Sequence, residues 1–205
     1  AGWYELEHTS YGLPFPSVGA RMDVLEEGVQ VIKSMLSQKS TTYSGNHFQV
    51  EDACSSPAPV QKSPRVWVGG LGERRTLRIV ARHADGWNAT GASPEVFRHK
   101  RRVLEKWCEV EGRDPTTISR SANVGFYIGV DNADADRRRR EFREFYGDLA
   151  DGLEGAMLFG TPAEAIDRIG VYGDAGAEGV NISMTVPFQW DALQAFVEEV
   201  VPAFD

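Results

Sequence analysis

The chain has 205 residues, of which 41% are hydrophobic and 25% charged, and its net charge is −8 with an isoelectric point near 5.1. This composition is typical of a globular domain, and the acidic balance argues against binding to nucleic acid or to an anionic membrane. No run reaches the roughly 18 apolar residues that span a bilayer, and Cys54 and Cys108 lack metal-ligand spacing. We therefore expect a cytoplasmic protein without a metal site.

The first third of the chain predicts a loop, a helix and a hairpin. Residues 1–17 are rich in turn formers and predict a loop. An amphipathic helix is predicted over 21–36, because apolar residues recur there three or four positions apart. They are Met22, Leu25, Val29, Ile32 and Leu36. Residues 41–53 place Ser-Gly-Asn between two short runs and predict a hairpin, which is followed by a proline-rich connector.

From residue 65 onward, short apolar runs alternate with helical patterns. The predicted strands are 66–68, 85–90, 121–130 and 179–184. The predicted helices are 73–83, 94–111, one from about 133, one from about 162 and a last one over 189–201. This order predicts parallel βαβ units and an α/β fold. Four units fit half of a (β/α)8 barrel or an open doubly wound sheet, and periodicity alone does not choose between them.

Two features of these segments bear on function. The basic run Arg137 to Arg140 is followed by acidic residues at helical spacing, which predicts a solvated helix face. The stretch "RVWVGGLGERRT" ends a strand in glycines just before a helix. Glycines there let backbone N–H groups approach a ligand, and a helix start adds free donors and partial positive charge. Gly70 and Gly72, with Arg74 or Arg75, therefore predict an anion site; a plain tight turn is the alternative.

Several stretches, taken in order, resemble the bacterial-luciferase-like superfamily, in the branch that uses the deazaflavin coenzyme F-420. They are "AGWYELEHTSYG", "RMDVLEEGVQVIKSML", "YSGNHFQVEDA", "PAPVQKSPRVWVGG", "LRIVARHADGWN" and "FGTPAEAIDRIGVYGDAGAEGVNISM". The resemblance implies one domain over 1–205, the C-terminal part of a luciferase-like TIM (β/α)8 barrel, with about four βα units and a hairpin insertion. Strands one to four, roughly 100 residues, are then expected upstream.

The same resemblance implies an oxidoreductase that uses reduced coenzyme F-420, or FMN, to transfer hydride to or oxygenate a small organic substrate. The implied cofactor-binding residues lie at the chain start and around the glycine turn. They are Ala1, Gly2, Glu7, Gly70, Gly72, Glu73, Arg74 and Thr76. Trp87 and Met184 stand at predicted strand ends and line a substrate pocket or pack in the core. The family's catalytic histidine lies in the early strands, so no catalytic residue is assigned.

Trp3 departs from the resembled sugar-phosphate dehydrogenases, which carry a glutamate at this place for proton transfer. The departure argues against that activity.

Two alternatives stay open: an FMN-dependent luciferase-like monooxygenase, and a non-catalytic half-barrel remnant that binds a flavin-type ligand or a partner. A homodimer is expected by resemblance. A half-barrel would expose strand edges near Val66 and Asn181 and an apolar inner face, so residues 1–205 alone are expected to self-associate.

Overall fold

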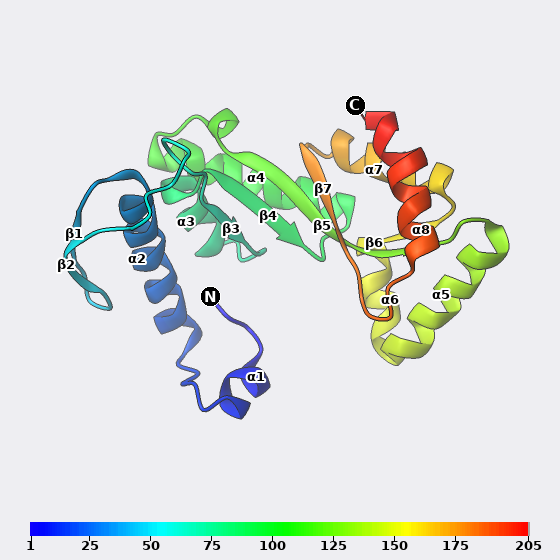
Figure 1. The fold of residues 1–205 in the computed structure, drawn as a ribbon, viewed down its shortest axis with the longest axis horizontal. Helices are drawn as coiled ribbons and strands as arrows, with labels where there is room; N and C mark the ends of the chain where they lie inside the picture. The colour runs from blue at the N-terminus through cyan, green and yellow to red at the C-terminus, as the bar shows by residue number, and fades with distance from the viewer. Residues whose placement is uncertain (205) are drawn as a thin grey trace.

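The computed structural model of the protein describes residues 1–204, and its central feature is a five-stranded parallel sheet between two groups of helices (Figure 1). The strands are β1 (Thr41–Ser44), β2 (Gln49–Ala53), β3 (Trp67–Gly69), β4 (Gly86–Thr90), β5 (Ser119–Ile128), β6 (Met157–Gly160) and β7 (Gly179–Ser183). The helices are α1 (Glu5–Ser10), α2 (Val18–Ser37), α3 (Thr76–His83), α4 (Pro94–Glu111), α5 (Asn132–Tyr146), α6 (Ala150–Leu153), α7 (Pro162–Asp174) and α8 (Trp190–Ala195).

Strand β5 organises the sheet because its ten residues pair with three other strands. Odd-numbered residues of β5 exchange hydrogen bonds with the segments of β4 and β6, whereas Arg120 bonds the segment that opens β7. Strands β4 and β6 therefore follow one another along one edge of β5, and β7 pairs with the other edge. Since all the pairings are parallel, the carboxyl ends of the strands lie at one end of the sheet.

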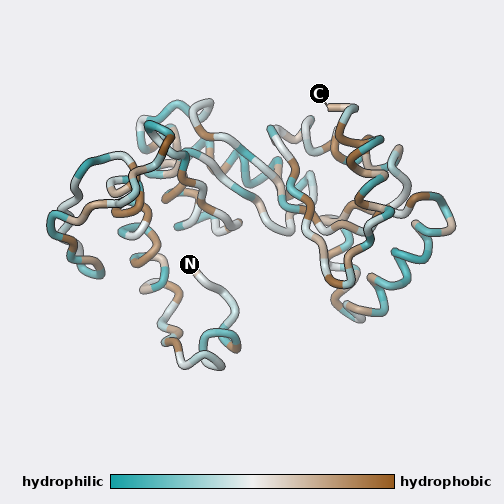
Figure 2. The backbone as a smooth tube through the Cα atoms, in the orientation of Figure 1, coloured by the Kyte–Doolittle hydropathy of each residue, from teal (hydrophilic) through white to brown (hydrophobic). Residues whose placement is uncertain are grey.

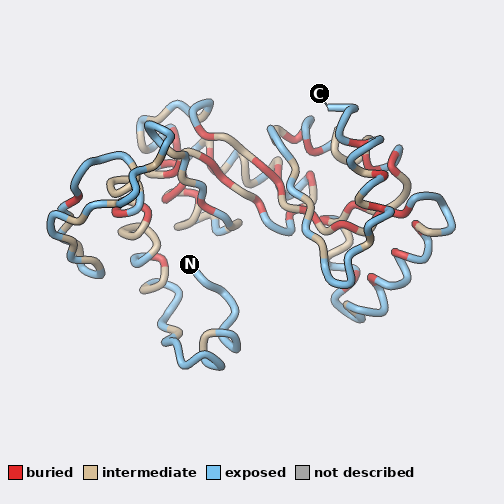
Figure 3. Tube along the Cα trace, viewed as in Figure 1, coloured by how far each residue is buried: buried red, intermediate tan, exposed pale blue. Residues whose placement is uncertain are grey.

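One face of the sheet is the core of the protein. Trp87 of β4 is completely buried and stacks on Phe97 of α4 with 5.0 Å between ring centroids. Phe97 in turn meets Tyr172 of α7 edge to face, and the Tyr172 hydroxyl donates to the carbonyl of Ala92 at 2.8 Å. Figure 3 shows that buried residues concentrate along β4, β5 and the helices behind them. This packing confirms the predicted βαβ arrangement.

The opposite face of the sheet is open and mainly polar. Asn88 donates to the Ser121 hydroxyl at 2.8 Å, and both residues line a hollow of about 510 Å³ together with Asn181. Trp67 is the large apolar residue of this hollow and is 43% exposed. The prediction of an apolar inner face was therefore wrong, because small and polar side chains occupy the alternate positions of β4, β5 and β7.

Helix α2 and the β1–β2 hairpin form the N-terminal part of the fold. Ser17 caps α2, whose buried residues include Met22 and Val29, so the predicted helix is confirmed. The Glu27 carboxylate accepts hydrogen bonds from the N–H groups of residues 46–48 and fixes the hairpin turn to α2. The hairpin prediction is confirmed as well.

Three elements differ from the predictions. Residues 5–10 form the short helix α1 instead of a loop, and its residues are not buried. Strand β6 was missed, because its four residues give too short a run for periodicity to show. The last helix is α-helical only over α8. It continues as a π-helix over Phe196–Val200 and as a 3-10 helix over Val201–Phe204. Thr161 and Glu164 form a capping box at the start of α7.

Candidate functional site

The turn from β3 to α3 requires glycine at two positions. Gly70 has a φ of +128°, which side chains of L-residues rarely adopt. A Cβ atom at Gly72 would lie 2.7 Å from the Thr76 hydroxyl oxygen, closer than atoms normally approach. The turn therefore packs its backbone against Thr76, the first residue of α3, and keeps the space above it free of side chains.

The backbone N–H groups of this turn that lack a partner within residues 1–204 begin at residue 71, one residue after the predicted Gly70. The Gly70 N–H donates to the carbonyl of Asn88 at 3.0 Å, and the Gly70 carbonyl accepts from Trp87 Nε1 at 2.8 Å. Gly70 is therefore engaged by the protein itself, which corrects the expectation that its backbone groups face a ligand. The N–H groups of residues 71–76 donate no hydrogen bond within residues 1–204. Consecutive donors of this kind at a helix start are the arrangement that the predicted anion site requires.

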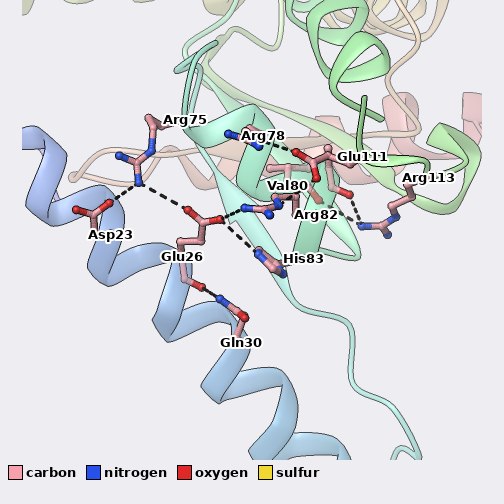
Figure 4. A network of polar contacts seen from close by, with 11 residues as sticks. Asp23, Glu26, Gln30, Arg75, Arg78, Val80, Arg82, His83, Glu111 and Arg113 are labelled. Carbon is pink, nitrogen blue, oxygen red and sulfur yellow. Dashed lines mark hydrogen bonds and ion pairs between the residues drawn. The ribbon is translucent and has the colours of Figure 1, made fainter. Parts of the chain in front are cut away.

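The charged residues of the turn divide into one free cation and two occupied groups. Arg74 is exposed and forms no ion pair within the described part of the chain. Arg75 is held by Asp23 at 2.6 Å (Figure 4). Glu73 accepts from Lys100 at 2.7 Å and from His99 at 2.8 Å, contacts that lower its pKa. The structure thus keeps Arg74 as a candidate ligand contact, but directs Glu73 toward α4 instead of the turn.

A polar network holds α3 between α2 and α4 (Figure 4). Arg82 bridges Glu26 of α2 at 2.7 Å and Glu111 of α4 at 3.1 Å. Arg78 bonds the same Glu111 at 2.7 Å and holds its pKa below the ordinary value. His83 lies 3.6 Å from Glu26, and burial lowers the pKa of this imidazole. These contacts fix the middle and the C-terminal end of α3 on both sides, and Arg75, which also reaches Glu26 at 3.6 Å, ties the preceding turn to α2.

The start of the chain lies in a different hollow. Ala1 and Gly2 line an apolar groove of about 520 Å³ against α2, together with His8 and Arg21. A Cβ atom at Gly2 would lie 2.8 Å from the His8 ring. No hydrogen bond within residues 1–204 joins Ala1 or Gly2 to the glycine turn. The Glu7 side chain is exposed in α1 and forms no ion pair or hydrogen bond in the same range, so its predicted support of the loop is absent.

Of the two predicted pocket residues, one is core and one lines a cavity. Trp87 packs within the core, the second of the two places predicted for it, and its indole N–H donates the bond that holds Gly70. Met184 is half-buried and lines a cavity of about 260 Å³ at the carboxyl ends of β5 and β7.

Sequence reasoning missed Tyr127 and Arg138, which line the same cavity as Met184. Arg138 is only 5% exposed, which corrects the prediction of a wholly solvated arginine run. The signal was the spacing of Ala135, Arg138 and Phe142, which places the arginine on the buried stripe of α5.

No group of three or more His, Cys, Asp or Glu side chains within residues 1–204 has the arrangement of a metal site. None of the helices there has the length and apolar character needed to cross a bilayer.

Comparison with known proteins relates the chain to flavin and deazaflavin enzymes. The family model described as luciferase-like monooxygenase matches residues 1–179. An F420-dependent glucose-6-phosphate dehydrogenase of Microbacterium testaceum is 31% identical over 96 residues, 46% of this chain and 28% of that enzyme. An uncharacterized protein of Mycobacterium tuberculosis is 27% identical over 113 residues, 55% of this chain and 39% of the relative. The chain thus spans well under half the length of these curated relatives.

Among solved structures, an F420-dependent secondary alcohol dehydrogenase in complex with an F420-acetone adduct superposes with a TM-score of 0.81 at 19% identity. The match covers 97% of this chain and 66% of that one. The fold is therefore that of luciferase-like TIM-barrel proteins over nearly the whole chain. Solved proteins with this fold include some whose names state F420 and others whose names state FMN.

Proposed function

Because the chain belongs to the luciferase-like monooxygenase family, we propose that it binds the phosphate of coenzyme F-420 or FMN in the turn between β3 and α3. The protein then acts as an oxidoreductase on a small organic substrate. The observation that carries the proposal is the run of unengaged N–H groups over residues 71–76 at the start of a helix, with the exposed Arg74 beside it. Backbone donors and a guanidinium are the groups that proteins use to hold phosphate.

The residues of the turn fit such a cofactor. Gly72 leaves the approach to the donors open, and Thr76 adds a hydroxyl at the helix start. The bond from Trp87 and the network around Glu26 hold the donors in place before a ligand arrives, so little ordering is needed on binding. When bound, the cofactor supplies the hydride or flavin chemistry, while this chain's residues bind it, orient it and exclude water.

Coenzyme F-420 is the preferred cofactor in this proposal. Two curated relatives that are 31% and 28% identical over parts of the chain are named as F420-dependent dehydrogenases. The family name favours the alternative, an FMN-dependent monooxygenase. We expect the protein to bind F-420 more tightly than FMN in a fluorescence titration. A clear preference for FMN would select the monooxygenase, and failure to bind either cofactor would contradict the proposed function.

We also propose that the chain is the C-terminal half of the barrel. Strands β3, β6 and β7 each pair with one other strand within the described residues, so each has one side unpaired there. The open polar face of the sheet would then face the other half of the barrel. The second candidate is a non-catalytic remnant of the barrel. One face of the sheet is open, and the match covers 39% of the Mycobacterium tuberculosis relative. Both observations fit an incomplete barrel.

A further inference from the structure

The cavity lined by Met184 lies at the same end of the sheet as the glycine turn. Its walls come from the carboxyl ends of β5 and β7 and from α5. Strand β7 is three strands away from β3 across the sheet, which corresponds to about 14 Å at the usual strand spacing. Parallel α/β proteins place ligands at this end of the sheet. By the strand registers, Gly69 lies at the level of Ser121 and the cavity begins at Phe126, so about 16 Å along the strands also separates the cavity from the turn.

The walls of the cavity are mainly apolar. Phe126, Phe145 and Met184 contribute hydrocarbon and thioether surface. Tyr127 contributes a ring that packs against Phe142, and burial raises the pKa of its hydroxyl, which stays a neutral donor. At about 260 Å³, the cavity suits the body of a small organic molecule.

Arg138 gives this apolar cavity one buried positive charge. Its side chain is 6% exposed, and its Nε has no hydrogen-bond partner within residues 1–204. Two carboxylates pair with Arg138 at the long end of the range: Nη1 donates to Glu141 Oε2 at 3.4 Å, and Asp134 Oδ1 lies 3.7 Å from Nε. The Glu141 side chain also lines the cavity. Both carboxylates bond more closely to Arg137, which approaches Glu141 at 2.9 Å.

A buried guanidinium with only long contacts is under-compensated, because burial removes its water and its partners are shared with another cation. The four charges of Asp134, Arg137, Arg138 and Glu141 sum to zero, so the cluster does not repel an anion as a whole. Planar carboxylates match the two-pronged geometry of a guanidinium, and a single carboxylate adds less charge to a half-buried cavity than a phosphate does.

We propose that this cavity binds a small organic carboxylate, with the apolar body against Phe126, Phe145 and Met184 and the carboxylate on Arg138. The substrate class of the oxidoreductase is then an aryl or alkyl carboxylic acid, and to this extent the inference rests on the proposed function. The place of the cavity at the carboxyl ends of β5 and β7 gives it the role of a substrate site, and Arg138 the role of a specificity-determining residue.

The test is calorimetric titration of the protein, without added cofactor, with 3-phenylpropanoate and with its uncharged analogue 3-phenylpropanamide. We expect the acid to bind at least 10-fold more tightly than the amide. Arg138→Gln should abolish this preference, and Arg138→Lys should retain part of it. The matched control Arg140→Gln removes an exposed arginine of the same helix and should leave both affinities unchanged.

A second variant covers the case in which Arg138→Gln does not fold. Met184→Trp fills the cavity without touching the charge cluster and should abolish binding of the acid. Equal affinities for acid and amide, no binding of the acid at 10 mM, or unchanged binding in the folded Arg138 or Met184 variants would overturn the inference. Because these titrations need no cofactor, their outcome is separate from the F-420 and FMN titration that tests the proposed function.

Discussion

At the scale of single residues, the adjacent charged side chains of the glycine turn point to different partners. Arg75 is committed to α2 through Asp23, and Glu73 to α4 through Lys100. Arg74 stands between them without an ion pair within residues 1–204. The alternation follows from the chain turning into α3, which sends successive side chains in different directions. Arg74 is therefore the residue whose removal tests ligand binding with the least effect on folding.

We expect Arg74→Gln to weaken binding of the preferred cofactor by about 10-fold or more, since charge-assisted hydrogen bonds contribute about 1.5–3 kcal/mol. Its melting temperature should stay that of the unmodified protein. The matched control is Arg102→Gln, which removes an exposed arginine of α4. Fluorescence titration of both variants measures the effect, and equal affinities of the two would remove Arg74 from the phosphate site.

At the scale of elements, Asp85 joins α2 to the loops before β3 and β4. Its carboxylate accepts from Lys33 of α2 at 2.8 Å and from the N–H of Val66 at 3.0 Å. Burial raises the pKa of Asp85, but these two bonds outweigh it and the net pKa is lowered. A lowered carboxyl pKa stabilises the fold at pH values above the ordinary value of about 3.9, and this stabilisation is lost as the pH falls through the folded pKa.

Asp85→Asn is accordingly expected to lower the free energy of unfolding by about 1–2 kcal/mol at pH 7. The difference from the unmodified protein should shrink as the pH falls below about 4, because the aspartate then becomes protonated as well. Urea denaturation at several pH values measures this. Asp148→Asn, at an exposed aspartate without an ion pair in the described chain, is the control. A pH-independent difference would show that the charge of Asp85 contributes nothing.

At the scale of the whole molecule, the sheet is covered on one face and open on the other (Figure 3). Charged α5 is mostly hydrophilic along its length (Figure 2). The outer strands β3 and β7 present free edges to other chains. Free edges promote association even where the exposed face is polar, because the backbone groups themselves pair.

Residues 1–205 alone are therefore expected to self-associate, with a mass by light scattering above the 22.7 kDa of one chain. Replacing the exposed β7 residues Asn181 and Ser183 by lysine should shift the mass toward that of the monomer, since lysine on an edge strand opposes pairing. The control carries lysine at Ala163 and Val171, exposed positions of α7. A monodisperse monomer with cooperative unfolding and full cofactor affinity would contradict the half-barrel proposal.

The local pattern of the sequence was enough to predict the alternation of strands and helices, the hairpin and the place of the glycine turn. These features depend on neighbours within a few residues, which a single sequence displays directly. The resemblance of the ordered motifs added the family, and the family match confirms it.

Only the tertiary structure decided which groups of the site are free. The Gly70 N–H is bonded by Asn88 and its carbonyl by Trp87, 18 and 17 residues away in sequence, and such distant partners leave no local pattern. Arg138 appears in the sequence as one of four adjacent arginines, yet the packing of α5 against β5 and β6 buries it while Arg140 stays exposed. Burial and hydrogen bonding are properties of the assembled fold, because they depend on which surfaces meet.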